Sequence, residues 1–455
     1  MNQNRQQRWK TVLTIAWPLI IANSFWNLQL TIDRIFLGMY STESLGAAMA
    51  VMGVFWVPMA LLQQTSSYVT TFVAQYFGAG QKHKIGESVW QAFFVSVVGG
   101  VCFLGLNFFS ADFFQVVGHS PTMQSLETSY FNSLSFTALP TALVAAISGF
   151  FTGLGRTKMV IGINFVGLIF NVLFDYIFIF GNLGFAAYGI EGAGYATAGA
   201  TYMAAIFGLF MIFTKANERE FSLLAQCRVN FSLLKNFLRF GIPSGLQWAL
   251  EGLAFTVFLI IMGKLENGEV ALSSSSIAIT IMMLAVLPSM GVAQAVLTLV
   301  GQKLGEKKPD EAEAYTWDGV ILSAIYITTM SASFLLFPEF YLSWFQNDSN
   351  PVLWAQVSEL TPKILAIIAV FIICDSFYLN ISFALKGAGD TSFVSLVALT
   401  IPWPLMVLPA SLLMDHKNAV IVSWRFVILY MLVSAGILTY RFRQGKWKSL
   451  SVINA

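Results

Sequence analysis

Four acidic side chains lie inside long apolar stretches of this sequence, where a charge is unfavourable unless it has a task. They are Asp33, Asp175, Glu251 and Asp375. A carboxylate at the centre of a bilayer costs roughly 2.5–3.5 kcal/mol on insertion scales, so such acids usually face a cavity and handle ions or substrate. Four of them in one apolar chain indicate ion-coupled transport.

The first two acids define a candidate site in the N-terminal half. Asn171 lies four residues before Asp175, so both side chains occupy one face of a helix. Thr197, on the next apolar segment, could join them and Asp33. Carboxylate and amide oxygens are the ligands that hard cations prefer, which makes Asp33 and Asp175 candidate Na⁺ ligands. The same carboxylates could carry protons, because burial and a neighbouring like charge favour the protonated acid. Alternatively, Asp33 pairs with Arg34 and only stabilises packing.

The other two acids, Glu251 and Asp375, define a second candidate site in the C-terminal half, again with Na⁺ as a candidate ligand. The competing interpretation of Glu251 is a structural hydrogen bond between helices. All three histidines fall in expected loops, which argues against a histidine proton relay. The sequence has no nucleotide-binding loop. Energy is therefore expected from an ion gradient, with no cofactor beyond Na⁺ or H⁺.

The composition places these acids in a membrane protein. The 455 residues are 56% hydrophobic and 11% charged, whereas soluble domains carry about 25% charged residues. Apolar segments long enough for the roughly 20-residue helix that crosses a bilayer recur along the chain. We expect twelve such spans in an all-α fold, near residues 11–38, 46–77, 88–109, 125–152, 159–182, 192–214, 236–263, 270–301, 316–346, 360–385, 392–413 and 419–440.

The basic residues predict the orientation of the spans. All but five of the 25 Lys and Arg residues fall at the N-terminus, the C-terminus and the loops on the same side. The positive-inside rule makes that side cytoplasmic. We therefore expect a multi-pass protein of the cell (inner) membrane with both termini in the cytoplasm, a lipid partner, no nucleic-acid partner and a monomeric state.

Short motifs recur in the same order in the two halves of the chain. Pro18 and Gly38 align with Pro243 and Gly263, Gln75-x-x-Gly78 with Gln302-x-x-Gly305, and Gly153-Leu-Gly155 with Gly387-Ala-Gly389. Six spans separate the copies, so the halves share one membrane orientation, and substrate is expected between or within the two bundles near mid-membrane. The predicted organisation is a six-helix lobe over residues 1–214, a cytoplasmic connection over 215–235 and a second six-helix lobe over 236–455.

These motifs, their order and their spacing resemble the multidrug and toxic compound extrusion (MATE) family. Further matches are Asn171-x-x-x-Asp175, Gly189-Ile-Glu-Gly-Ala-Gly194, Gly241-Ile-Pro243 leading to Glu251, and Asp375 leading to Gly387-Ala-Gly-Asp-Thr391. The resemblance implies a V-shaped pair of lobes that exports cationic compounds in exchange for Na⁺ or H⁺.

By the same resemblance, the two acid sets match sites of different branches of the family. Glu251 and Asp375 match the C-lobe cation site of the NorM-like branch. Asp33, Asn171, Asp175 and Thr197 match the N-lobe site of the DinF-like and archaeal branches. Two residues depart from these patterns, because Gln29 and Phe371 stand one turn before Asp33 and Asp375 where the respective patterns have Tyr.

The leading hypothesis is therefore a multidrug antiporter with Asp33, Gln29, Glu251 and Phe371 contacting cationic, lipophilic substrates. A flippase for lipids or lipid-linked oligosaccharides shares the architecture, but it should carry basic residues in its cavity to hold an anionic headgroup. An enzyme is disfavoured because the acids are scattered over four spans without a His, Ser or Cys partner at motif spacing. A channel suits a duplicated twelve-span chain with central acids less well than alternating access does.

Overall fold

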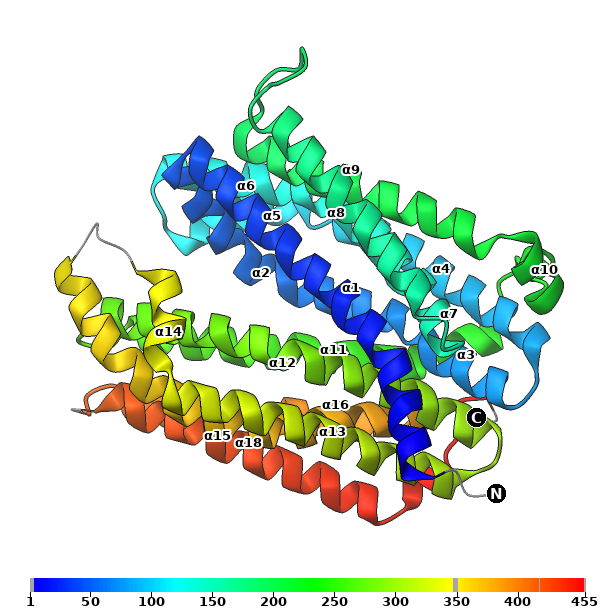
Figure 1. Cartoon of the computed structure of the whole chain (residues 1–455). Coiled ribbons are helices and arrows are strands. Elements are labelled where there is room, and N and C mark those ends of the chain that lie inside the picture. The colour runs from blue at the N-terminus through cyan, green and yellow to red at the C-terminus, as the bar shows by residue number, and fades with distance from the viewer. Residues whose placement is uncertain (1–3, 347–350, 417, 454–455) are drawn as a thin grey trace. The chain divides into compact units, whose positions relative to one another are not determined.

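The computed structural model describes residues 4–346, 351–416 and 418–453, and within them it contains helices and loops but no strand. Twelve helices are long and apolar enough to cross a membrane, which confirms the expected number of spans. They are α1 (Arg5–Tyr40), α2 with α3 (Thr42–Ser67, Val69–Gly78), α4 (Lys82–Leu104), α6 with α7 (Pro121–Leu134, Ala138–Gly153), α8 (Lys158–Phe178), α9 (Gly189–Ile212), α11 (Phe231–Gly263), α12 (Gly268–Gly305), α13 (Pro309–Leu336), α15 (Pro351–Ala388), α16 with α17 (Thr391–Thr400, Leu408–Leu412) and α18 (Ala419–Arg443) (Figure 1).

Proline shapes several of these helices. The helix expected near 316–346 ends instead at Leu336, and Pro338 begins the separate short helix α14 (Pro338–Leu342). Proline lacks an amide donor and is favoured at the first position of a helix, which explains the break. Between α16 and α17 the chain forms a π-helical turn over Trp403–Val407. Two further short helices, α5 (Asn107–Val117) and α10 (Lys215–Phe221), connect spans.

The described residues form two compact units. The N-terminal unit contains residues 18–249, 301–308 and 451–453. The C-terminal unit contains residues 4–17, 250–300, 309–346, 351–416 and 418–450. In the N-terminal unit α9 packs along α8 and also touches α6 and α7, and in the C-terminal unit α15 packs against both α13 and α18 (Figure 1). Helices α7 and α9 in the N-terminal unit and α15 in the C-terminal unit each pack against several others.

The start of α1 belongs to the C-terminal unit because a buried acid holds it there. Asp318 on α13 is 2% exposed and accepts hydrogen bonds from Arg8 Nε at 2.6 Å and from Trp9 Nε1 at 3.0 Å. Arg5 Nε lies 3.3 Å from the same carboxylate. A partly buried, charge-assisted contact of this kind is stronger than an exposed ion pair. Pro18 is the first residue of α1 that belongs to the N-terminal unit.

The internal repeat is visible in how glycines allow helices to approach. A Cβ on Gly153 would lie 2.7 Å from the carbonyl oxygen of Thr70, and a Cβ on Gly387 would lie 2.6 Å from that of Leu297. Gly153 and Gly387 are motif counterparts, and Thr70 and Leu297 are separated by the same spacing as Gln75 and Gln302. Each half thus uses its own copy of the motif for the same close helix contact.

The second repeated motif makes a reciprocal contact inside the N-terminal unit. A Cβ on Gly78 would lie 2.0 Å from the carbonyl oxygen of Gln302, and a Cβ on Gly305 would lie 2.2 Å from that of Gln75. Only glycine permits such an approach of two backbones. The Gln302 side chain then donates to the carbonyl oxygen of Gly153 at 2.8 Å, so the two repeated motifs are joined directly.

Candidate functional site

The structure brings the four predicted residues of the N-terminal site together from three helices. Asp33 comes from α1, Asn171 and Asp175 from α8, and Thr197 from α9, and the Asp33 carboxylate faces the other three side chains. Asn171 and Asp175 are fully buried, and Asp33 and Thr197 are less than a tenth exposed. Arg34 points outward and makes no ion pair with Asp33 in the described part of the chain, so Asp33 is oriented toward α8 and α9.

These side chains approach one another without completing their hydrogen bonds. Among the described residues, Asp33 Oδ1, both Asp175 oxygens and both terminal atoms of the Asn171 amide have no hydrogen-bond partner. Thr197 Oγ1 donates to the carbonyl oxygen of Ala193 at 3.0 Å, which leaves an oxygen lone pair for another partner. A buried polar group without a partner costs about 1–3 kcal/mol. The cluster therefore has the oxygen donors and the unmet hydrogen-bonding capacity of a site for a small cation or protons.

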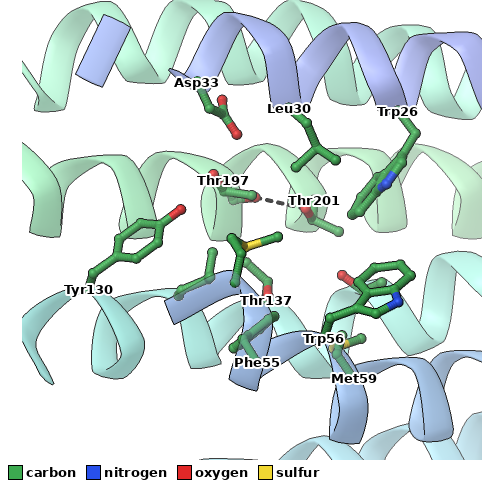
Figure 2. Close-up of a pocket in the computed structure, with 13 residues that line it drawn as sticks. Trp26, Leu30, Asp33, Phe55, Trp56, Met59, Tyr130, Thr137, Thr197 and Thr201 are labelled. Carbon is green, nitrogen blue, oxygen red and sulfur yellow. Dashed lines mark hydrogen bonds between the residues drawn. The ribbon is translucent and has the colours of Figure 1, made fainter. Parts of the chain in front are cut away.

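A small cavity of about 30 Å³ adjoins Asp33. Figure 2 shows the Asp33 carboxylate and the Tyr130 hydroxyl pointing toward the space beside Thr197, with Trp26 and Trp56 at the other end. The two indole rings lie 6.5 Å apart between centroids. The cavity is large enough for a water-sized guest, and it joins a carboxylate to an aromatic wall.

Sequence reasoning named Gln29 in this region but missed Tyr130. Gln29 is 7% exposed and lies one turn before Asp33 on the same face of α1, yet it does not line the cavity, whereas Trp26, Leu30 and Asp33 do. Tyr130 lies on α6, within electrostatic range of both Asp33 and Asp175. Its sequence signal was only that of one tyrosine in an apolar segment.

The second site lies in the C-terminal unit, where α15 meets α11. Asp375 on α15 is 9% exposed, Glu251 on α11 is half-buried, and the two carboxylates interact electrostatically. The hydroxyl of Tyr378 donates a hydrogen bond to Glu251 Oε1. Tyr378 was not predicted, although it follows Asp375 by three residues and therefore lies on a neighbouring part of the same helix face.

Phe371, the other predicted substrate contact, is 3% exposed and packs edge-on against Phe255 with 6.4 Å between ring centroids. Phe255 in turn contacts Tyr430, which lies near both Glu251 and Asp375. Phe371 is therefore part of an aromatic layer beside the acids. The phenol groups at this site come from Tyr378 and Tyr430, while the position one turn before Asp375 remains apolar.

A buried cation, Lys386, lies on the same helix as Asp375. Lys386 is 2% exposed near the end of α15, and the charged group that acts on it is Glu251. From sequence, Lys386 was counted only among the basic residues of the cytoplasmic side. No cluster of three or more His, Cys, Asp or Glu side chains arranged for a metal ion occurs in the residues that the structure describes.

Comparisons with known proteins place the chain in a family. The MatE family model matches residues 18–177 and 243–408, once in each half. A probable multidrug resistance protein NorM from Listeria innocua is 25% identical over 98% of this chain and 97% of its own, and one from Thermotoga maritima is 24% identical over 98% and 94%. A MATE protein crystallised with MaL6 has the same fold, with a TM-score of 0.87 at 20% identity, covering 98% of this chain and all of the other.

The family model covers well over half of the chain, and both of its matches coincide with the repeated halves described above. The twelve apolar helices and the structural match agree with this assignment. The protein is thus a multi-pass membrane transporter and not an enzyme, and it belongs to the MatE, or multidrug and toxic compound extrusion, family.

Proposed function

We propose that this protein is a multidrug efflux antiporter that exports cationic, lipophilic compounds by alternating access, driven by an inward gradient of Na⁺ or H⁺. The observation that carries the proposal is the presence of two separate sets of carboxylates on membrane-spanning helices, buried or half-buried, one in each unit. A multidrug role also agrees with the names of the relatives. The protein would reside in the cell (inner) membrane with both termini in the cytoplasm and work as a monomer.

The N-terminal site supplies the chemistry for a lipophilic cation. Trp26 and Trp56 offer ring faces that attract a cation, and Asp33 offers a charge at the other end of the same cavity. Met52 and Met59 also line it, and flexible thioether side chains adapt to guests of different shape. A small resting cavity with adaptable walls suits a transporter whose site opens during the cycle.

Exchange requires that ion and substrate favour different conformations, because a ligand with equal affinity for two states shifts neither. Asp33 and Asp175 would bind the coupling ion in one state and release it when a cationic substrate takes over the negative charge in the other. Glu251 and Asp375 could perform the same exchange in the C-terminal unit. Both acid pairs are therefore candidate Na⁺ or proton carriers.

The test is ethidium efflux from proteoliposomes energised separately by an inward Na⁺ gradient at fixed pH and by an inward H⁺ gradient. Efflux driven by Na⁺ would favour Glu251 and Asp375 as the coupling site, with variants of each pair deciding between the units. Efflux driven by H⁺ alone would favour Asp33 and Asp175. Absence of efflux under both gradients would overturn the proposal.

A lipid or lipid-linked oligosaccharide flippase is the second candidate, and the burial of Lys386 is the observation that favours it, since such a protein must hold an anionic headgroup. Glu251 acts on Lys386, however, and this reduces the positive charge that the site would offer to an anion. A flippase would move a fluorescent anionic lipid between leaflets without either gradient, and an antiporter would not.

A further inference from the structure

Lys386 is a fully buried cation within the set of helices that carries the C-terminal acids. It is among the largest fully buried side chains of the residues that the structure describes. An unpaired charge is very costly in such surroundings, so a buried lysine needs a partner. Asp390 is close in sequence, but Arg441 already binds it through Nε at 2.7 Å and Nη2 at 3.3 Å.

The helix geometry directs Lys386 toward the acid site. Asp375, Ser382 and Lys386 are separated by seven and four residues, so they lie along one face of α15. Side chains on a helix lean toward its N-terminus, which points the lysine stem back toward Asp375. Its Nζ lies 4.9 Å from the centroid of the Phe383 ring, and Glu251 is the acid whose charge acts on it.

We propose that Lys386 is a resident cation of the Glu251–Asp375 site. Its positive charge offsets part of the negative charge with which the two acids would otherwise attract a coupling ion or a cationic substrate. The inference rests on the proposed function and deepens it. When both carboxylates are ionised, Lys386 leaves the site with one net negative charge, which suits one monovalent cation at a time.

The N-terminal site offers an internal contrast. The residue aligned with Lys386 through the Gly153 and Gly387 motifs is Thr152, which is neutral. Among the residues that the structure describes, the basic side chain whose charge acts on Asp33 is Arg34, which is exposed. The resident cation is therefore a property of the C-terminal unit, and it gives the two acid sites different net charges.

The experiment is equilibrium binding of tetraphenylphosphonium to the purified full-length protein in nanodiscs at one pH and low Na⁺. Lys386→Met keeps most of the side-chain length and removes the charge. At an effective dielectric constant of about 20, removing a charge about 10 Å away changes the affinity for a cation by a factor on the order of ten. We expect Lys386→Met to bind the probe about ten-fold more tightly and Lys386→Arg to bind it as the unmodified protein does.

Two further variants separate charge from packing. The exposed Lys235→Met is the matched control and should not alter binding. In a Glu251→Gln background, Lys386→Met should no longer increase affinity, because a buried lysine without its carboxylate partner favours the neutral amine and then carries no charge for the substitution to remove. If Lys386→Met alone fails to fold, the double variant should fold, since neither charge is then left unpaired in the interior.

The outcomes distinguish this inference from the proposed function. Equal affinity in Lys386→Met and the unmodified protein overturns the inference, as does a Lys386→Arg variant altered as much as Lys386→Met, or a double variant that fails to fold while Glu251→Gln folds. An increase that persists in the Glu251→Gln background also overturns it. Failure of the unmodified protein to bind tetraphenylphosphonium at all overturns the proposed function itself.

Discussion

The two halves of this transporter share a backbone frame but differ in the chemistry they place on it. Gly153 and Gly387 permit the same close helix approach in their respective units. The acids do not follow this symmetry. Helices α1 and α11 are counterparts, but Asp33 aligns with Phe258 and not with Glu251, and Asp175 lies on the fifth span whereas Asp375 lies on the tenth, the counterpart of the fourth. Duplication therefore maintained the contacts that fix the helices and left the side chains facing the interior free to diverge.

The charge at one position of the repeated glycine motif also differs between the two halves. Arg156 in the N-terminal motif donates to Glu220 Oε2 at 2.7 Å, and the aligned Asp390 accepts from Arg441 Nε at 2.7 Å. The sign of the charge is exchanged, and each residue has a partner of opposite sign. A position can thus keep its structural task while its charge reverses, provided that the partner changes as well.

The largest expected effect comes from the N-terminal acids. Asp33→Asn should abolish ethidium export while expression and folding are preserved, because the neutral amide carries no titratable proton and offers no negative charge to a cation. Asp112→Asn, an exposed acid on α5, is the matched control and should export normally. An Asp33→Asn protein that pumps at the unmodified rate would remove Asp33 from the mechanism.

A smaller effect is expected from the C-terminal acids. Asp375→Asn leaves the Tyr378–Glu251 hydrogen bond in place but removes one carboxylate, so Na⁺-driven efflux should fall about ten-fold, within the usual range of coupling energies. The measurement is efflux against Na⁺ concentration at fixed pH. If Asp375→Asn is silent and Asp33→Asn is inactive, coupling resides in the N-terminal unit alone.

Because the two halves share the same close helix contact, we expect glycine substitutions at that contact to reduce stability by similar amounts in both. Gly153→Ala and Gly387→Ala each place a Cβ within 3 Å of a backbone oxygen, which should destabilise the protein by about 1–3 kcal/mol. Gly436→Ala, whose Cβ would meet nothing within 4 Å, is the control. Thermal unfolding of the purified variants measures the effect. A loss at only one of the two motif glycines would show that the repeat contacts are not equivalent.

The exchanged ion pairs should differ in strength because they differ in burial. Asp390 is 9% exposed in its side chain and Glu220 is 27% exposed. Asp390→Asn should therefore cost about 1.5–3 kcal/mol, as expected for a hydrogen-bonded charge, and Glu220→Gln less than about 1 kcal/mol. Comparison of their melting temperatures tests this, and equal losses would contradict it.

The contribution of the Arg156–Glu220 ion pair to the free energy of unfolding should depend on pH in one direction. Hydrogen bonds from Arg156 and Lys82 hold the pKa of Glu220 below its usual value of 4.5. The stability that Glu220 contributes is therefore fully present above pH 4.5. It is lost as the pH falls through the lower pKa of the folded state. The difference in melting temperature between Glu220→Gln and the unmodified protein should disappear on acidification below that range.

Much of the fold could be predicted from the sequence because its signals are local. Length and hydropathy determine a membrane span, since a bilayer of fixed thickness accepts any apolar helix of about 20 residues. The recurring motifs predicted the duplication, and the four intramembrane acids stood out because charges are rare in such segments. Asn171 and Asp175 could be placed together because a spacing of four residues fixes one helix face.

Only the tertiary structure decided which side chains meet between helices. It brought Tyr378 to Glu251, placed Tyr130 beside Asp33, excluded Gln29 from the cavity and buried Lys386 near the end of α15. These contacts depend on the rotation and approach of whole helices, which glycine motifs distant in sequence determine together. Local periodicity fixes the face on which a residue lies, but the packing of neighbouring helices decides what that face touches.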